Sequence, residues 1–146
     1  MNTATPDPGS AATSGPAGTT SLPTYAPGEC NIGEDEIRVR RQGAIAAGVG
    51  ALVLWGILAA VDAPPILRLI VGIPAGAAAI SALQVRNRFC VAFAMQGLEN
   101  VSGSVGEAIR IVNPEDRQVD RRRASRMVAV GAVVGVATGV VAAVLG

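Results

Sequence analysis

The stretch MVAVGAVVGVATGVVAAVLG, residues 127–146, decides the fold that this sequence predicts. It carries no charge, and it is apolar around its whole circumference rather than along one face. Two similar stretches cover residues 43–61 and 66–84. Because a helix rises about 1.5 Å per residue, a span of this kind reaches roughly 28 Å, close to the hydrocarbon thickness of a bilayer. We therefore expect an all-α membrane protein with three transmembrane helices.

The composition favours this class over a soluble protein built from buried helices. Half of the 146 residues are apolar, yet aromatic residues make up only 3%, and large aromatic anchors are what soluble cores normally use. The net charge of +1 gives no basic field for nucleic acid. Histidine is absent, which removes the commonest metal ligand and general base. We expect the lipid bilayer as a partner, and no nucleic acid, metal or cofactor.

The order of segments predicts four parts. Residues 1–29 are rich in Pro, Ser, Thr and Gly and should form a disordered tail. Residues 30–101 should form a two-helix membrane hairpin, with spans of about 43–61 and 66–84 joined by a tight turn at Asp62-Ala63-Pro64-Pro65. Residues 102–126 are the expected cytoplasmic helical linker, and residues 127–146 the third transmembrane helix.

Local signals predict where helices begin, bend and end. The first helix should begin at Glu34, in the headgroup layer, and Pro74 should kink the second. An interfacial helix is expected over residues 89–97. The capping-box pattern from Ser104 to Glu107 predicts a short helix over about 105–112. Asn113 and the proline after it predict the start of a third helix of about 30 residues.

Charged side chains near the ends of the spans predict ion pairs. Two pairs have the acid four residues before the base, the favourable order on a helix: Glu34 with Arg38, and Glu36 with Arg40. Asp62 and Arg68 lie close enough to pair across the turn. We favour the simpler interpretation that these two charges stay in water and headgroups.

The arginines predict the orientation. Eleven of the twelve precede the first span or lie between the second and third; Arg68 is the exception. Two crossings separate these groups, so they share one side of the membrane, and arginines collect on the cytoplasmic side. We expect the N-terminus and loop 86–126 in the cytoplasm, and the C-terminus outside.

Small residues in the spans predict close helix packing. The third span has four at intervals of four, and the second span has two more: Gly131, Gly135, Gly139, Ala143, Gly72 and Gly76. Helices associate in lipid through close backbone approach over such positions. The groove can serve self-association or partner docking, or it can receive the helix of residues 43–61 within the same chain. Small residues at Ala46 and Gly50 favour the intramolecular interpretation.

Two cysteines, Cys30 and Cys90, should meet at the cytoplasmic face, because a hairpin returns its two ends to one side. Three interpretations remain open. They can form a redox or sulfur-carrying dithiol activated by nearby arginines. They can contribute to a metal site, which would need a second chain. They can also be unreactive packing thiols, which we favour.

The segment Cys30-Asn31-Ile32-Gly33, followed by a basic helix, two short spans and then Arg88-Phe89-Cys90-Val91-Ala92-Phe93, resembles a family of small two-helix bacterial membrane domains of unknown function. The resemblance covers about residues 30–101, and such domains occur alone or fused to rhodanese sulfurtransferases. It implies a bacterial inner-membrane location, a cytoplasm-facing Cys90, and sulfur or thiol traffic. Val91 departs from the family pattern, which has proline after the cysteine.

The predicted function is that of a non-catalytic accessory or scaffold subunit that packs through small-residue helix faces, as a homo-oligomer or in a larger membrane complex. No catalytic triad or phosphate-binding glycine loop is recognisable in the sequence. The alternative is a membrane-anchored thiol or sulfur relay through Cys30 and Cys90. A channel is disfavoured, because the middles of the spans hold almost no polar residues.

Overall fold

The computed structural model describes residues 24–101 and 104–145. Three helical segments, Glu34–Ala60, Pro65–Asn87 and Pro114–Leu145, are long and apolar enough to cross a membrane. The expectation of an all-α protein with three such helices is confirmed at this level. Residues 1–23 of the predicted tail lie outside the described residues.

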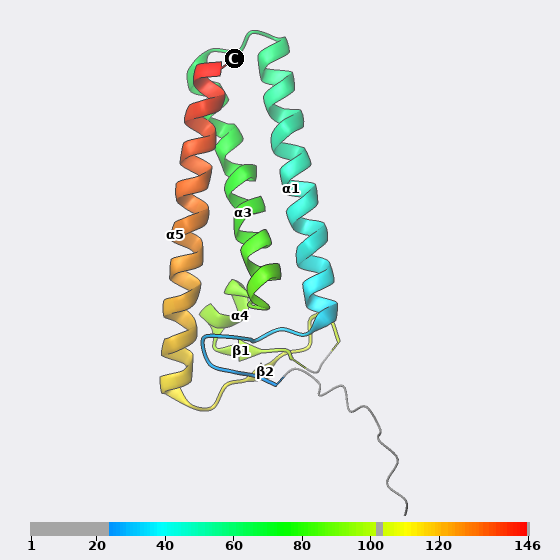
Figure 1. Ribbon diagram of the computed structural model, residues 1–146, viewed down its shortest axis with the longest axis vertical. Coiled ribbons are helices and arrows are strands. Elements are labelled where there is room, and N and C mark those ends of the chain that lie inside the picture. Colours follow the sequence, from blue (N-terminus) through cyan, green and yellow to red (C-terminus); the bar gives the residue numbers. More distant parts are fainter. Residues whose placement is uncertain (1–23, 102–103, 146) are drawn as a thin grey trace, which may run out of the picture.

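The three segments stand side by side (Figure 1). The first is α1 (Glu34–Ala60), the second contains α2 (Pro65–Arg68), η1 (Leu69–Val71) and α3 (Gly72–Asn87), and the third is α5 (Pro114–Leu145). α3 lies between α1 and α5 and packs against both. The C-terminus and the α1–α2 turn lie at one end. The opposite end carries α4 (Val91–Gln96) and the short antiparallel pair β1 (Leu98–Glu99) and β2 (Ile109–Arg110).

The ends of the long helices follow the predicted signals. α1 begins at Glu34 with three acidic residues in its first turn, where the helix dipole favours negative charge. At its other end Asp62 adopts a left-handed conformation, with φ of 50°, before the two prolines. α5 begins at Pro114, and the Asn113 side chain caps it by accepting a hydrogen bond of 3.0 Å from the Glu115 N–H.

The second segment is irregular one turn before Pro74. A 3-10 turn over Leu69–Val71 separates α2 from α3. Pro74 has no N–H to offer the carbonyl of Ile70, four residues earlier, so the regular bonding pattern cannot run through this turn. The sequence predicted a kink at Pro74, and what the structure has at this place is a turn of tighter winding.

The small-residue groove of α5 receives α3, so the expectation that it receives the first helix is wrong. A Cβ placed on Gly135 would lie 2.6 Å from the carbonyl oxygen of Gly72, and one on Gly139 would lie 2.7 Å from that of Leu69. A Cβ on Gly76 would lie 2.9 Å from the carbonyl oxygen of Gly131. Each neighbouring atom belongs to the backbone and cannot move aside cheaply. Toward the C-terminus the buried small residue is Ala142 rather than Ala143.

One prediction about the polar segments needs correction, and one holds. Residues 105–112 form a turn and β2 instead of a helix, although the Glu107 carboxylate does accept a hydrogen bond of 2.9 Å from the Ser104 N–H. The pairing of β2 with β1 takes the residues that a helix would need. The expected short helix is present as α4, and it ends at Gly97, whose φ is 69°.

The ion pairs differ in part from expectation. Arg40 pairs with Glu36 at 3.3 Å, as predicted. Glu34 pairs instead with Arg88, at 2.7 Å, because the chain returns to the first turn of α1 after α3. Arg38 pairs with Asp35 at 3.7 Å.

Arg68 is not left to water and headgroups, which corrects the favoured interpretation. Its side chain is buried within the protein, and its Nη2 lies 3.2 Å from the Asp62 carboxylate. Because Asp62 itself is exposed, it can hold the cation without losing its own hydration.

We predict that Gly135→Ala lowers the free energy of unfolding by about 1–3 kcal/mol, because the added methyl group overpacks a backbone contact. The matched control is Gly50→Ala, since a Cβ at Gly50 meets no atom within 4 Å. This control should be neutral or slightly stabilising. Unfolding by denaturing detergent, followed by helicity, measures both variants. Equal losses in the two would contradict the contact.

Candidate functional site

The polar end of the bundle, here called the cap, comprises residues 24–33, 88–101 and 104–113 with the first two turns of α1 and α5 and the last turn of α3. It gathers most of the buried polar side chains of the described chain: Asn31, Glu36, Gln84, Asn100 and Asp120. Buried polar groups are costly unless hydrogen-bonded. Their arrangement therefore defines the candidate site.

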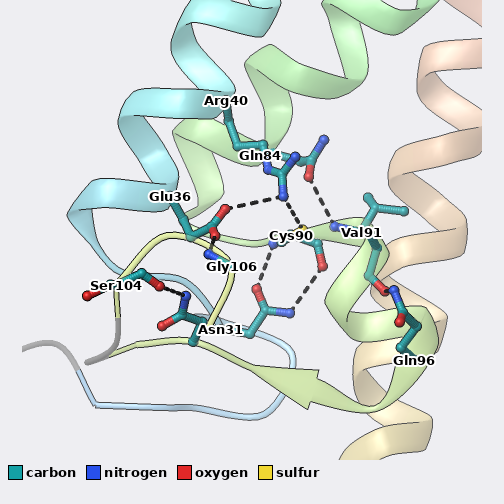
Figure 2. Close-up of polar contacts among 11 residues, drawn as sticks. Asn31, Glu36, Arg40, Gln84, Cys90, Val91, Gln96, Ser104 and Gly106 are labelled. Carbon is teal, nitrogen blue, oxygen red and sulfur yellow. Dashed lines mark hydrogen bonds and ion pairs between the residues drawn. The ribbon is translucent and has the colours of Figure 1, made fainter. Parts of the chain in front are cut away.

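Asn31 clamps the backbone of Cys90 (Figure 2). The Cys90 N–H donates a hydrogen bond of 2.6 Å to Asn31 Oδ1, and Asn31 Nδ2 donates one of 3.2 Å to the Cys90 carbonyl. Both residues are fully buried. The amide of Asn31 thus ties the segment before α1 to the segment that follows α3, 59 residues later in the chain.

Local backbone features bring these two segments together. Arg88 ends α3 in a left-handed conformation, with φ of 50°, and its carbonyl accepts hydrogen bonds from the N–H groups of Asn31 and Ile32. The Gly33 N–H donates a bond of 2.8 Å to the Asn100 carbonyl. A Cβ at Gly33 would lie 2.5 Å from the carbonyl oxygen of Val101. A side chain at position 33 would collide with the backbone at Val101, so this position requires glycine.

Arg40 links the thiol of Cys90 to a carboxylate. Its Nη2 lies 3.2 Å from Cys90 Sγ and 3.3 Å from Glu36 Oε2. The other oxygen of Glu36 accepts a hydrogen bond of 2.8 Å from the Gly106 N–H. Figure 2 shows the guanidinium group between the carboxylate and the sulfur. The guanidinium group therefore joins the sulfur to the carboxylate, and burial of the thiol keeps reagents away from it.

Cys30 lies in the same cap but is not bonded to Cys90. It is partly exposed, and its thiol donates a hydrogen bond of 3.6 Å to the Ile32 carbonyl. Both cysteines are free thiols. Among the described residues, no three His, Cys, Asp or Glu side chains gather in a way that could hold a metal ion.

A second buried cluster surrounds Asp120, in the charged part of α5 before the apolar stretch. Its carboxylate accepts a bond of 2.6 Å from the Gly28 N–H and one of 3.1 Å from the Tyr25 hydroxyl. Desolvation raises the pKa of Asp120, although these two bonds oppose the shift. Desolvation, followed by the charge of Asp120, also raises the pKa of Tyr25, so its hydroxyl stays a donor.

This cluster corrects the boundary of the predicted tail. Residues 24–29 were expected to be disordered, but Ala26 and Cys30 form a bridge that closes a turn. Asp120 then anchors that turn through Tyr25 and Gly28, and Arg123 donates a hydrogen bond to the Gly28 carbonyl. These long-range polar contacts stabilise the segment, which has too few apolar residues to be held by hydrophobic packing.

Sequence reasoning identified the two cysteines and the glycines but missed Asn31 as a clamp and Asp120 as an anchor. Asn31 was visible only as part of the motif that carries the family resemblance. Asp120 is a lone acid just before three consecutive arginines. This pattern is equally typical of a helix face that is exposed to solvent. Comparison of the chain with protein-family models, curated proteins and solved structures finds no match.

We predict slow labelling of Cys90 by maleimide in a Cys30→Ser background, because the thiol is fully buried. Asn31→Ala should accelerate labelling about tenfold or more, since an unsatisfied buried N–H costs about 1–3 kcal/mol. The matched control is Gln96→Ala, which removes an exposed side chain from α4, the helix that begins directly after Cys90. Unchanged labelling in Asn31→Ala would contradict the clamp. Wild-type labelling faster than that of free cysteine would instead support the relay hypothesis.

We predict that wild-type protein loses stability relative to Asp120→Asn as the pH rises above about 4. The folded-state pKa of Asp120 lies above the unfolded value of 3.8. The carboxyl group therefore contributes its full stability below the unfolded pKa and loses it as the pH rises through the folded pKa. Unfolding free energies of the two proteins, measured in detergent from pH 4 to 8, test this. A difference that stays constant, or grows in favour of the wild type, would contradict it.

Proposed function

We propose that this chain is a small multi-pass protein of a bacterial inner membrane, acting as a non-catalytic accessory or scaffold subunit. In this proposal α1 offers its outer face to a transmembrane helix of another subunit, and the cap lies in the cytoplasm. The observation that carries the proposal is the uneven packing of the three helices.

α1 packs against the rest of the bundle along one side only. Its inner face meets α3, and Ala51 is the one buried residue in its apolar part. By contrast, α5 buries Gly131, Gly135 and Gly139 in direct backbone contact. α1 therefore keeps a larger share of its apolar stretch exposed than α5 does.

The outer face of α1 has the spacing that helices use to approach closely in lipid. Ala46 and Gly50 are four residues apart, as are Gly56 and Ala60, and all four are exposed. A Cβ at Gly50 or at Gly56 would meet no atom within 4 Å. Since glycine weakens a helix by about 1 kcal/mol relative to alanine, two such open positions are explained by a partner that needs the space.

The charge distribution supports the proposed orientation. Eleven arginines lie at the cap end, and Arg68 alone lies at the other end, buried and paired with Asp62. Because Asp62 neutralises this one arginine, the two ends of the bundle differ even more in positive charge. Arginines near the ends of spans favour the cytoplasmic side, so the C-terminus is proposed to be outside.

The non-catalytic role is supported by how the buried polar groups of the cap are used. Asn31, Glu36 and Asp120 each bond to backbone groups of another segment. Groups employed in this way hold the cap together and are not directed at an open cleft.

A thiol or sulfur relay is the second candidate, favoured by the 3.2 Å contact between Arg40 and the sulfur of Cys90. It requires the buried thiol to become accessible during turnover. The labelling measurement described above separates this candidate from the first.

We predict that wild-type protein, isolated from its native membrane in mild detergent after cross-linking, carries a stoichiometric partner, either another membrane protein or a second copy. Gly50→Leu/Gly56→Leu should lose most of this partner, because two bulky side chains block the outer face of α1. Ala129→Leu, an exposed position on α5, is the matched control and should retain it. Retention by the double variant, with Cys90 still protected from maleimide, would refute the proposal.

A further inference from the structure

A hollow of about 500 Å³ lies beside α5 where its sequence changes from charged to apolar. One wall is formed by the apolar side chains of Leu83, Met127 and Val130. The other wall includes Arg122, Arg123 and Arg126. The hollow is therefore amphipathic: along α5 the arginines precede Met127 and Val130, and Val119 and Gly28 complete the lining on the cap side.

Two of these three arginines have no internal counter-charge. Arg123 is engaged, because it donates to the Gly28 carbonyl and, at 2.8 Å, to Asn87 Oδ1, and it stacks over the Phe89 ring at 5.5 Å. Arg122 and Arg126 are exposed, and no carboxylate of the described residues lies within ion-pair distance of either.

The nearest acid on the same helix is already occupied. Asp120 is fully buried, and its two oxygens accept hydrogen bonds from Gly28 and Tyr25. Arg122 and Arg126 are four residues apart, a spacing at which like charges on a helix repel each other. An anion placed between them relieves that repulsion. Guanidinium groups suit phosphate oxygens in particular, through paired hydrogen bonds of fixed geometry.

The apolar wall indicates whether the hollow suits free phosphate or a phospholipid. Met127 follows Arg126 directly, and Val130 lies one turn further toward the middle of the helix. A free phosphate would leave this wall unused. A phospholipid places its phosphate at the membrane surface and its acyl chains beyond it, in the same order as the two walls of the hollow.

We infer that this hollow binds the headgroup of an anionic phospholipid, with the phosphate held by Arg122 and Arg126 and the start of an acyl chain against Leu83, Met127 and Val130. Arg123 positions the floor of the site by holding Gly28 and Asn87 together. The inference rests on the membrane placement of α5, but it is independent of any protein partner of α1.

The test uses the purified full chain in mild detergent, titrated with dimyristoyl phosphatidylglycerol or dimyristoyl phosphatidylcholine and followed by native mass spectrometry. Wild-type protein should bind the anionic lipid more tightly. Arg122→Gln/Arg126→Gln should lower its affinity for phosphatidylglycerol about tenfold or more and leave phosphatidylcholine binding unchanged. Arg110→Gln/Arg121→Gln removes the same charge from exposed arginines outside the hollow and should leave both affinities unchanged.

An unchanged affinity of Arg122→Gln/Arg126→Gln for phosphatidylglycerol would overturn the inference. An equal loss of affinity in both double variants would also overturn it, because it would indicate general charge attraction. Inorganic phosphate in large excess should displace little lipid, because it lacks an acyl chain. Complete displacement would assign the hollow to free phosphate and overturn the lipid assignment. Protection of Cys90 from maleimide reports whether each variant is folded. If a double variant is not folded, Arg126→Gln alone replaces the variant of the hollow, and Arg121→Gln alone replaces the control. Because no partner protein is present, failure here is distinct from failure of the proposed subunit role.

Discussion

The bundle depends on direct backbone contact between α3 and α5. Lipid gives apolar helices no hydrophobic reason to associate, so their stability relies on dispersion at very short range. The two backbones can approach this closely because glycines, which have no side chain, face each other: Gly72 and Gly76 on one helix, and Gly131 and Gly135 on the other. α1 then packs on the other side of α3 through ordinary side-chain contacts. As a result, α1 has glycines that contact nothing on its outer face, at Gly50 and Gly56, whereas Gly131, Gly135 and Gly139 of α5 are buried against the second segment.

The cap performs a complementary task with polar contacts. Hydrogen bonds at this end of the molecule join segments that lie far apart in the chain. Asn31 ties the start of α1 to the segment after α3, and Asp120 ties α5 to the turn at Gly28. The cap therefore fixes all three helices at one end, while the glycine contact fixes two of them along their length. The exposed arginines that these bonds do not use, Arg122 and Arg126, remain free to meet lipid phosphates.

Much of the fold was predictable because single residues carry strong local signals. The proline pair after Asp62, the cap at Asn113 and the left-handed Gly97 each end or begin a helix for reasons confined to a few neighbours. The choice of helix partners was not predictable in this way. Small residues on all three spans fit several pairings, and only the three-dimensional arrangement selects α3 for the groove. Asn31 and Asp120 were missed because their partners lie 59 and 92 residues away.

Solid-state NMR of the protein in lipid bilayers, with ¹³Cα-labelled glycine, tests the central contact most directly. A Cβ on Gly135 would lie only 3.3 Å from Gly76 Cα, so dipolar recoupling should give a cross-peak between the Cα atoms of these two glycines. Dilution of the labelled protein into excess unlabelled protein should leave that cross-peak unchanged, because both glycines belong to one chain. An absent cross-peak would contradict the account, and so would one that disappears on dilution, since the groove would then join separate molecules.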